Sequence, residues 1–327
     1  MAEDMVTDRP KHYVRPDVAG FLAFLNAMDG PEMSALPLAE ARAAYLAMTP
    51  VAEADPRPLS VIRDLSCPGP AGQIPLRLYD ARESRDPGPV VMFFHGGGFV
   101  IGDLDTHHNL CTEIAAELDL PVVAVHYRLA PEHKFPAAPD DCEAATRWVA
   151  GNPAELGRKA TGLIPMGDSA GGNLTIVVTQ ALAERPAEVP VVLQVPIYPL
   201  SDEKSDHQSM VDFGEGHLLT RNAMEWFGES YAAKSGDKRA YPILGEHATT
   251  PPTVLVTAGL DPIRDSGRVY GIELIRAGSD VIFLEMKGSI HGFVNLRKAV
   301  PSAQRDLHAI FDAIRLLLDK HKDDAAR

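Results

Sequence analysis

The sequence predicts an α/β fold in which a mostly parallel sheet of about eight strands is flanked by helices. Short runs such as Val122-Val123-Ala124-Val125 are apolar throughout rather than alternating, as expected for strands that are buried on both faces of a parallel sheet. Such runs alternate with segments that have the length and composition of helices, which is typical of right-handed crossovers between parallel strands. In open sheets of this kind, ligands bind beyond the carboxyl ends of the strands.

Eight segments are expected to be strands. The first two flank the Gly69-Pro70-Ala71-Gly72 turn, which favours an antiparallel hairpin. The expected strands are 59–66, 74–79, 90–94, 121–127, 163–166, 191–195, 253–257 and 281–285. The expected helices among them are 109–118, 140–150, 173–183 and 267–277, with a further helix at the C-terminal end.

Two stretches fall outside this alternation. Residues 1–15 are polar and are expected to form a loose arm, which two helices at 18–28 and 36–48 follow. The second stretch, 201–250, is polar and acidic with a helix at 221–233, and a connection of that length in a compact domain is usually functional. We expect residues 1–50 and 201–250 to build a helical cap on a catalytic domain made of 51–200 and 251–327. For the N-terminal helices, ordinary packing on the main domain is the alternative.

Composition limits the partners of the chain. The 327 residues carry a formal net charge of −14, which argues against nucleic acid or an anionic membrane surface as a partner. The three cysteines, Cys67, Cys111 and Cys142, fit neither a disulfide framework nor a metal-binding spacing, so reduced thiols in a cytoplasmic protein are expected. No secretory signal is recognised, and no apolar run reaches the roughly 18 residues of a membrane span.

Ser169 lies in the stretch Gly167-Asp168-Ser169-Ala170-Gly171-Gly172. A short apolar run precedes this stretch, and a segment with the length of a buried helix follows it. Strand, sharp turn and helix are the context of a G-x-S-x-G nucleophile elbow, in which the serine hydroxyl is exposed at the helix N-terminus. Glycines at 167 and 171 allow strand and helix to approach closely. The alternative for this pattern by itself is a glycine-rich turn without chemistry.

A second glycine-rich segment supports the reactive serine. His95-Gly96-Gly97-Gly98-Phe99 directly follows the apolar run at 89–94, so the glycines begin where a buried strand ends. A segment of this type in this place lends backbone N–H donors to the oxyanion hole of lipases and esterases. We expect His95 to hold the segment by hydrogen bonds rather than to transfer protons.

A serine nucleophile requires a histidine base and a carboxylate that orients the histidine. In enzymes with a nucleophile elbow the acid follows the serine and the base comes last. His291, on a glycine-flanked loop after the last expected strand, is the candidate base; His308 and His321 lie in the terminal helix and are expected to be solvated. Asp261 directly follows the strand at 253–257 and is the candidate acid, with Asp265 as the alternative.

The remaining motifs do not indicate a cofactor. His107 and His108 are adjacent and therefore cannot share a helix face, and no H-E-x-x-H or other metal-binding spacing accompanies them. The sequence contains neither a P-loop nor a G-x-G-x-x-G fingerprint. We expect no metal and no nucleotide cofactor.

Taken together, these motifs resemble those of the hormone-sensitive-lipase-like α/β-hydrolases, the bacterial family IV carboxylesterases. The matching segments are 95–99, Tyr127 to Glu132 with Phe135 to Ala138, 167–173, 261–265 and 291–293. The resemblance implies an α/β-hydrolase fold and a carboxylesterase acting on short to medium acyl chains.

The family also implies roles for individual residues. Ser169, Asp261 and His291 would form the triad, and the N–H groups of Gly97, Gly98 and Ala170 would form the oxyanion hole. His95, Gly96 and Asp168 would support these groups. Relatives often carry an acidic residue where this chain has Ser266, so contacts around the histidine are not carried over. Many relatives form homodimers through an edge strand, so a monomer or a homodimer is expected.

Two other functional hypotheses are compatible with the sequence. A non-catalytic ligand receptor can share this fold, as the plant hormone receptors that resemble these esterases do, but such proteins tend to lose the histidine, which is present here as His291. Lactone or amide hydrolysis, or acyl transfer, could use the same residues. Neither the acyl preference nor the physiological substrate follows from the sequence.

Overall fold

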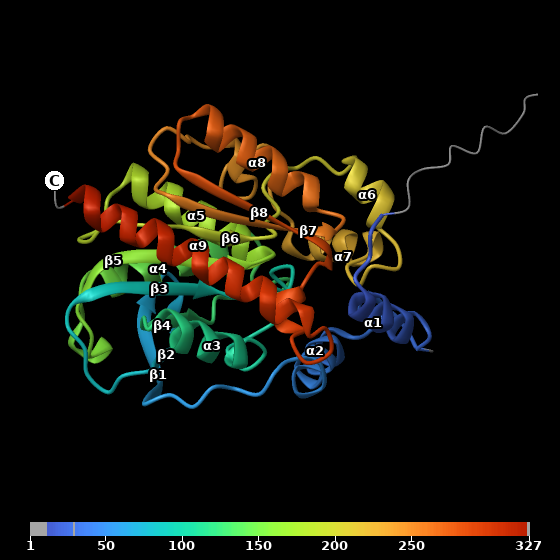
Figure 1. Cartoon of the computed structure of the whole chain (residues 1–327), viewed down its shortest axis with the longest axis horizontal. Helices are drawn as coiled ribbons and strands as arrows, with labels where there is room; N and C mark the ends of the chain where they lie inside the picture. The colour runs from blue at the N-terminus through green and yellow to red at the C-terminus, as the bar shows by residue number, and fades with distance from the viewer. Residues whose placement is uncertain (1–11, 29, 326–327) are drawn as a thin grey trace, which may run out of the picture.

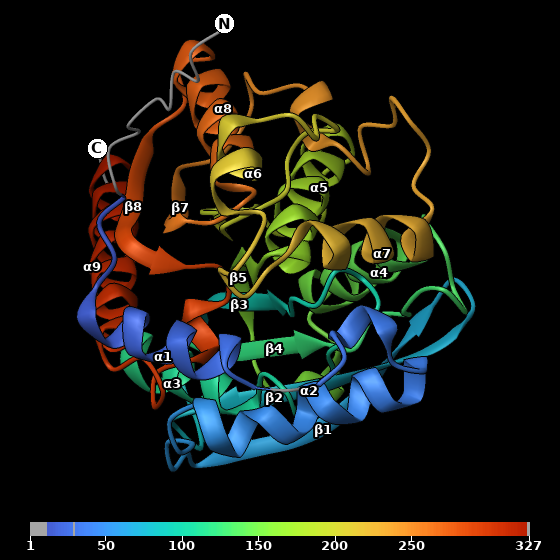
Figure 2. The same ribbon diagram turned by 90° about the vertical axis from the view of Figure 1, so that its right-hand side faces the viewer.

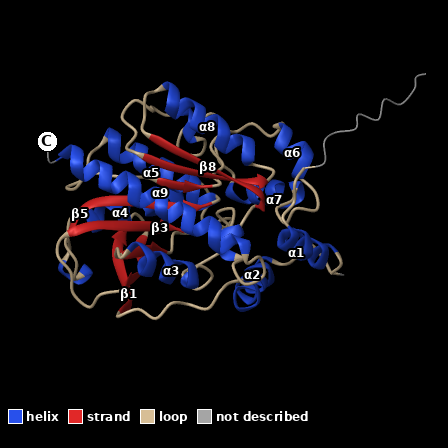
Figure 3. Cartoon of the chain, viewed as in Figure 1, coloured by secondary structure: helices blue, strands red, loops and turns tan. Residues whose placement is uncertain are grey.

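The computed structural model describes residues 12–28 and 30–325, and it shows the predicted α/β fold with an eight-stranded sheet (Figures 1 and 3). The strand order is β1-β2-β4-β3-β5-β6-β7-β8. The strands are β1 (Val61–Gly69), β2 (Gly72–Asp80), β3 (Gly88–Phe94), β4 (Val122–Val125), β5 (Ala160–Asp168), β6 (Val195–Ile197), β7 (Thr253–Leu260) and β8 (Val281–Ile290). The β1–β2 hairpin and the β2–β4 pair are antiparallel, and the other pairs between these strands are parallel.

Helices cover both faces of the sheet. They are α1 (Pro16–Asn26), α2 (Leu38–Ala52), α3 (His108–Leu118), α4 (Ala137–Ala150), α5 (Ala170–Glu184), α6 (Gln208–Phe213), α7 (Arg221–Tyr231), α8 (Arg264–Arg276) and α9 (Ser302–Ala325). Short 3₁₀ turns are η1 (Met33–Ala35), η2 (Ala154–Leu156), η3 (Pro242–Leu244) and η4 (Phe293–Asn295). No helix in the described part of the chain combines the length and the apolar character needed to cross a membrane.

Alternate side chains of the central strands enter different layers of the core. On β3, Val91 and Phe93 pack in the cluster that contains residues of α3 and α9, whereas Met92 and Phe94 pack in the cluster with residues of α4 and α5. Successive side chains of a strand point to opposite faces. Because both faces are covered, the strand is apolar at every position, and this explains the uninterrupted apolar runs.

The helices that flank the carboxyl ends of the strands come from two separate parts of the sequence, the N-terminal stretch and the 201–250 stretch. In Figure 1, α1, α2, α6 and α7 gather at the right-hand side of the molecule, and Figure 2 shows this side facing the viewer. The 201–250 stretch is attached to the helix after β5: the Asn173 side-chain amide donates to the carbonyls of Leu200 and Ala240, each at 2.8 Å. The division into a catalytic domain and a cap stays a prediction.

Beyond shifted element ends and the unpredicted helix α6, three details differ from the sequence prediction. The strand expected at 191–195 is β6, at Val195–Ile197, while Val191 and Gln194 make only isolated bridges. An apolar sequence indicates that a segment is buried, but a buried segment need not form a continuous set of strand hydrogen bonds. Helix α2 continues through Pro50 to Ala52, so the proline lies in the last turn of the helix rather than after its end.

The third difference concerns the N-terminal arm. Residues 1–11 lie outside the described part of the chain. Arg15, by contrast, is anchored: its guanidinium donates to Asp306 of α9 at 2.5 and 2.9 Å, and its backbone N–H donates to Gly288 of β8. Residue 15, directly before α1, is therefore held against the main domain.

Candidate active site

Ser169 lies on the sharp turn between β5 and α5, in the strand–turn–helix context that the sequence predicts. Its backbone angles, φ 56° and ψ −116°, are unusual for a residue with a side chain and store strain. A Cβ atom at Gly171 would lie 1.8 Å from the carbonyl oxygen of Phe94, and one at Gly167 would lie 2.4 Å from the same atom. Glycine is therefore required at both positions for the helix to start this close to the sheet.

His291 links Ser169 to Asp261 at the carboxyl edge of the sheet. His291 Nε2 lies 2.8 Å from Ser169 Oγ, and His291 Nδ1 lies 2.8 Å from Asp261 Oδ2. A carboxylate only accepts hydrogen bonds, so Nδ1 carries the proton and Nε2 is free to accept from the serine hydroxyl. Asp261 is completely buried, and its second oxygen accepts from the backbone of Ile263 at 2.9 Å.

The alternative residues lie elsewhere. Asp265 accepts from Arg264, from Arg268 and from the backbone of Ser209. His308 is exposed on α9, and the side chain of His321 lies outside the described residues. Ser266 is buried and its hydroxyl accepts from the backbone N–H groups of Ser201 and Asp202, so it fixes the start of the 201–250 stretch.

The glycine-rich loop after β3 lies against the serine turn. The Gly96 N–H donates to Asp168 Oδ1 at 2.9 Å. Gly97 has a φ of 116°, and a Cβ there would lie 2.2 Å from the carbonyl oxygen of Ile101. Gly98 has a φ of 59°, and a Cβ there would lie 2.2 Å from the ring of Phe227 on α7. These contacts leave no space for side chains on the loop.

His95 braces this loop. Its Nδ1 lies 2.8 Å from the carbonyl oxygen of Gly96, and its own carbonyl accepts from the Tyr127 hydroxyl at 2.7 Å. Burial, together with the neighbouring His107, lowers the pKa of His95 to about 3. The imidazole is therefore neutral near pH 7, and Nδ1–H is the donor to Gly96.

Asp168, directly before the serine, has two partners that the sequence analysis missed. His107 Nε2 lies 3.2 Å from Asp168 Oδ1, and the Tyr198 hydroxyl donates to Asp168 Oδ2 at 3.3 Å. Burial alone would raise the pKa of Asp168, but the contacts with His107 and the Gly96 N–H lower it overall. Tyr198 follows β6, so its place at a strand end was a usable signal. Nothing in the sequence around His107 indicates its partner.

A cavity of about 460 Å³ opens over these groups. Ser169, His291, Gly97, Gly98 and Ala170 lie in its wall. The remainder of the wall is largely apolar and comes mainly from the N-terminal helices and the 201–250 stretch. These lining residues include Met33, Tyr45, Met48, Leu218, Leu219, Met224, Trp226, Phe227 and Tyr231.

One group of side chains has the mutual distances of a metal site. It consists of Glu113, Glu117 and His308, and none of the three is among the cavity-lining residues. Arg57 contacts both glutamates, and Gln304 contacts Glu113 and His308. These side chains are thus already engaged in polar contacts within the protein.

Fold and side-chain contacts together are those of a serine hydrolase, and comparison with known proteins agrees. A family model described as alpha/beta hydrolase fold matches residues 91–295. The ethyl acetate hydrolase of Pseudomonas putida is 34% identical over 315 residues, covering 92% of this chain and 98% of the relative. Carboxylesterase NlhH of Mycobacterium tuberculosis is 37% identical over 237 residues, covering 70% of this chain and 74% of the relative.

Solved structures are similar over nearly the whole chain. An ester hydrolase from the metagenome of Lake Arreo, in complex with a derivative of bipyridine phosphonate, superimposes with a TM-score of 0.86 at 36% identity, covering 93% of this chain and 98% of that one. A hyperthermophilic esterase from the archaeon Pyrobaculum calidifontis gives 0.85 at 32% identity, covering 94% and 99%. The chain therefore belongs to the alpha/beta hydrolases, in their hormone-sensitive-lipase-like group, and it is a carboxylic ester hydrolase.

Proposed function

We propose that Ser169, His291 and Asp261 are the catalytic triad of this carboxylesterase. The observation that carries the proposal is the continuous contact from Ser169 Oγ through the His291 ring to Asp261, with 2.8 Å at each step. Through these contacts the weakly nucleophilic hydroxyl has both a base and a fixed tautomer of that base. The same chain of contacts argues against a receptor without catalysis.

The reaction proceeds through an acyl-enzyme. His291 Nε2 takes the proton of the Ser169 hydroxyl while the oxygen attacks the ester carbonyl, and the resulting imidazolium protonates the leaving alcohol. A water molecule then attacks the acyl-enzyme with His291 again as the base, which releases the acid and restores the serine. Asp261 stays ionised and stabilises the imidazolium in both steps.

The N–H groups of Gly97, Gly98 and Ala170 form the oxyanion hole in this proposal. Support comes from their place in the wall of the cavity that Ser169 and His291 share, and from the contacts that exclude side chains at both glycines. Ala170 is also the first residue of α5, so its N–H is one of the free donors at a helix N-terminus. One such donor is typically worth about 10²–10³ in turnover.

Short to medium acyl chains are the proposed substrates. A cavity of about 460 Å³ with largely apolar walls suits a chain of this kind. In this proposal residues 1–50 and 201–250 act as a cap, since both stretches supply parts of these walls. We also propose a cytoplasmic protein, since its three cysteines are free and buried, and a monomer or a homodimer paired through an edge strand.

Esters of graded acyl length, from acetyl to decanoyl, test these assignments when purified protein is compared with Ser169→Ala. Turnover is expected to fall by about 10⁴-fold or more in Ser169→Ala, with an unchanged melting temperature. Ser235→Ala, at an exposed serine of the 201–250 stretch, is the matched control and should keep full activity. Most of the turnover surviving in Ser169→Ala would exclude the triad. Lactone and amide substrates in the same screen show whether other leaving groups are accepted.

A further inference from the structure

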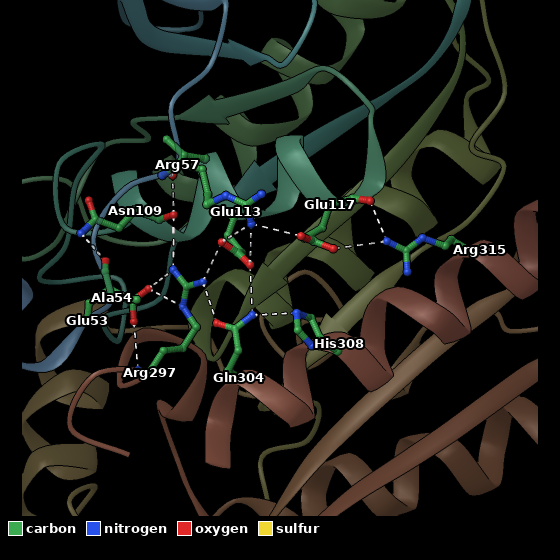
Figure 4. A network of polar contacts seen from close by, with 11 residues as sticks. Glu53, Ala54, Arg57, Asn109, Glu113, Glu117, Arg297, Gln304, His308 and Arg315 are labelled. Atoms are coloured by element: carbon green, nitrogen blue, oxygen red, sulfur yellow. Dashed lines mark hydrogen bonds and ion pairs between the residues drawn. The ribbon is translucent and has the colours of Figure 1, made fainter. Parts of the chain in front are cut away.

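Arg297 lies at the centre of a polar network that joins the segment after α2 to α3 and α9 (Figure 4). The side chains of Arg297 and Glu53 are each only 1% exposed. Arg297 Nε donates to Glu53 Oε1 at 2.6 Å, Nη2 donates to the same oxygen, and the Arg297 backbone N–H donates to Glu53 Oε2 at 3.1 Å. Backbone and side chain of one residue thus hold both oxygens of one carboxylate.

The other guanidinium donors are also engaged. Nη1 lies 3.2 Å from Glu113 Oε2 and donates to Gln304 Oε1 at 3.2 Å, while Nη2 reaches the carbonyl of Asn109 at 3.4 Å. The Asn109 side chain in turn donates to the carbonyl of Ala54. Figure 4 shows the guanidinium enclosed between these groups, so its position is determined from three sides.

Glu53 and Arg297 do not line the cavity themselves, but each directly follows a residue that does, Ala52 and Leu296. Glu53 is the residue that ends α2, and α2 contributes Tyr45 and Met48 to the cavity wall. Arg297 follows His291 after the short η4 turn, and Leu296, its neighbour, also lines the cavity. Glu53 and Arg297 therefore connect a substrate wall to the loop that carries the proposed base.

Backbone contacts reinforce the same junction. The N–H groups of Lys298 and Ala299 both donate to the carbonyl of Ala52 at 3.0 Å. The Lys298 ammonium donates to the carbonyl of Pro50 at 2.8 Å. The last turn of α2 is thus attached directly to the chain that follows His291.

A contribution to stability does not explain the ion pair well. Burial raises the pKa of Glu53, and the charge of Arg297 only partly offsets this. A buried pair often stabilises a fold no more than apolar side chains of similar volume. What an ion pair adds over apolar packing is direction, because five guanidinium donors in a fixed plane match only one placement of their acceptors.

We propose that Glu53 and Arg297 are positioning residues, which hold the α2 wall and the His291 loop in one fixed relative placement for catalysis. The proposal rests on the function proposed above for His291. Removing the pair is expected to shift the imidazole and the wall relative to each other. Misplacement of a reacting group by about 1 Å can cost up to about 10²-fold in rate.

Three variants test this role: Glu53→Gln, Arg297→Lys and the double replacement of both residues by Met. Glu117→Gln is the matched control, because Glu117 lies in the same network but its carboxylate pairs with Arg57 and Arg315 rather than with Arg297. Turnover and KM are measured on acetyl and octanoyl esters well below each melting temperature. We expect Glu53→Gln and Arg297→Lys to lower kcat by about 10- to 100-fold with little change in KM for the acetyl ester, while Glu117→Gln retains wild-type kcat.

The double variant separates positioning from stability. Each single variant leaves an uncompensated buried charge or a poor fit, so the melting temperature should fall, whereas the apolar pair should restore it. If the pair positions the loop, kcat of the double variant stays at least about tenfold low despite the restored melting temperature. Recovery of kcat together with stability overturns the proposal.

The single variants decide the matter if the double variant does not fold. Wild-type kcat in Arg297→Lys and in Glu53→Gln then overturns the proposal. These outcomes are distinct from a failure of the proposed triad, because wild-type activity and its loss in Ser169→Ala are measured on the same esters. The positioning role alone is refuted if the wild type is active, Ser169→Ala is inactive, and the Glu53 and Arg297 variants are fully active.

Discussion

The strand ends and the helices above them are built in different ways. At the strand ends, hydrogen bonds of 2.8 to 2.9 Å link buried groups, as between His291 and Asp261 or Gly96 and Asp168. Glycines there touch neighbouring backbone so closely that a single methyl group would not fit. Most of α5, which begins at the serine turn, is buried.

The helices over the cavity are less buried, although contacts with the segment after His291 fix the last turn of α2. In α7 only Tyr231 is buried, and in α2 only Ala41 and Ala52 are. The side chains that these helices present to the cavity are largely apolar, and apolar contacts are not directional. This contrast between strand ends and helices indicates that close contacts fix the positions of the reacting groups. Substrate preference depends instead on apolar side chains that can be replaced. Substitutions at the strand ends should thus reduce all activities, and substitutions in the helices should redistribute them.

The largest effect at the strand ends is expected for Asp261→Asn. The amide can present its own N–H to His291 Nδ1 and favours the wrong tautomer, so kcat should fall by about 10⁴-fold. Asp265→Asn is the matched control, because Asp265 follows the same strand but contacts Arg264, Arg268 and Ser209. Turnover of an acetyl ester at pH 8 provides the measurement. A larger loss in Asp265→Asn than in Asp261→Asn would reverse the assignment of the acid.

Next in size is Gly98→Ala. The added methyl group would meet the Phe227 ring, and the φ of 59° disfavours any side chain. Displacement of the loop should remove a donor of the proposed oxyanion hole and cost about 10²–10³ in kcat. Gly20→Ala, in α1, has no heavy atom within 4 Å of its new Cβ and should leave kcat unchanged. Equal kcat values for the two variants would contradict the contrast between strand ends and helices.

The sequence could predict the strand ends well because the constraints there are local. Ser169 was recognisable from its flanking glycines, and the structure shows why, since a Cβ at either 167 or 171 would collide with the carbonyl of Phe94. His291 and Asp261 were selected as polar residues directly after strands, and parallel strands bring their carboxyl ends to one edge. The three side chains are in contact as that selection requires.

Other contacts could not be predicted, because they join segments that are far apart in the sequence and have no shared pattern. His107 meets Asp168, Phe227 covers Gly98, and Arg297 meets Glu53. Each partner lies on a loop or a helix whose docking is a tertiary property. Apolar content likewise predicted a strand at 191–195, but not that the ladder starts only at Val195.

Protonation of His95, a residue at the strand ends, should lower the free energy of unfolding of the protein in acid. Its folded pKa of about 3 lies below the unfolded value of 6.5, so between these values the unfolded chain binds a proton that the folded protein does not. Stability is full above pH 6.5 and falls by about 1.4 kcal/mol per pH unit below it, or about 2.7 kcal/mol by pH 4.5. Urea unfolding of wild type and His95→Gln at both pH values isolates this contribution, because the other titrating groups are common to both proteins. Parallel losses in the two proteins would exclude His95 as the cause.

The smallest effect, and the one that defines the helices, is expected for Phe227→Ala. The ring lies over Gly98 and forms part of the cavity wall, so its removal enlarges the space beside the reacting carbonyl. Removing an apolar side chain of this size changes the free-energy difference between two substrates by about 1–3 kcal/mol. The preference for the octanoyl over the acetyl ester should therefore change by about tenfold or more. The kcat for the acetyl ester should stay within about threefold of wild type. Phe24→Ala, at a ring of α1 that is 60% exposed, is the control and should leave the ratio unchanged. An equal loss of kcat on both esters would instead indicate that Phe227 holds the Gly98 loop in place, like the residues at the strand ends.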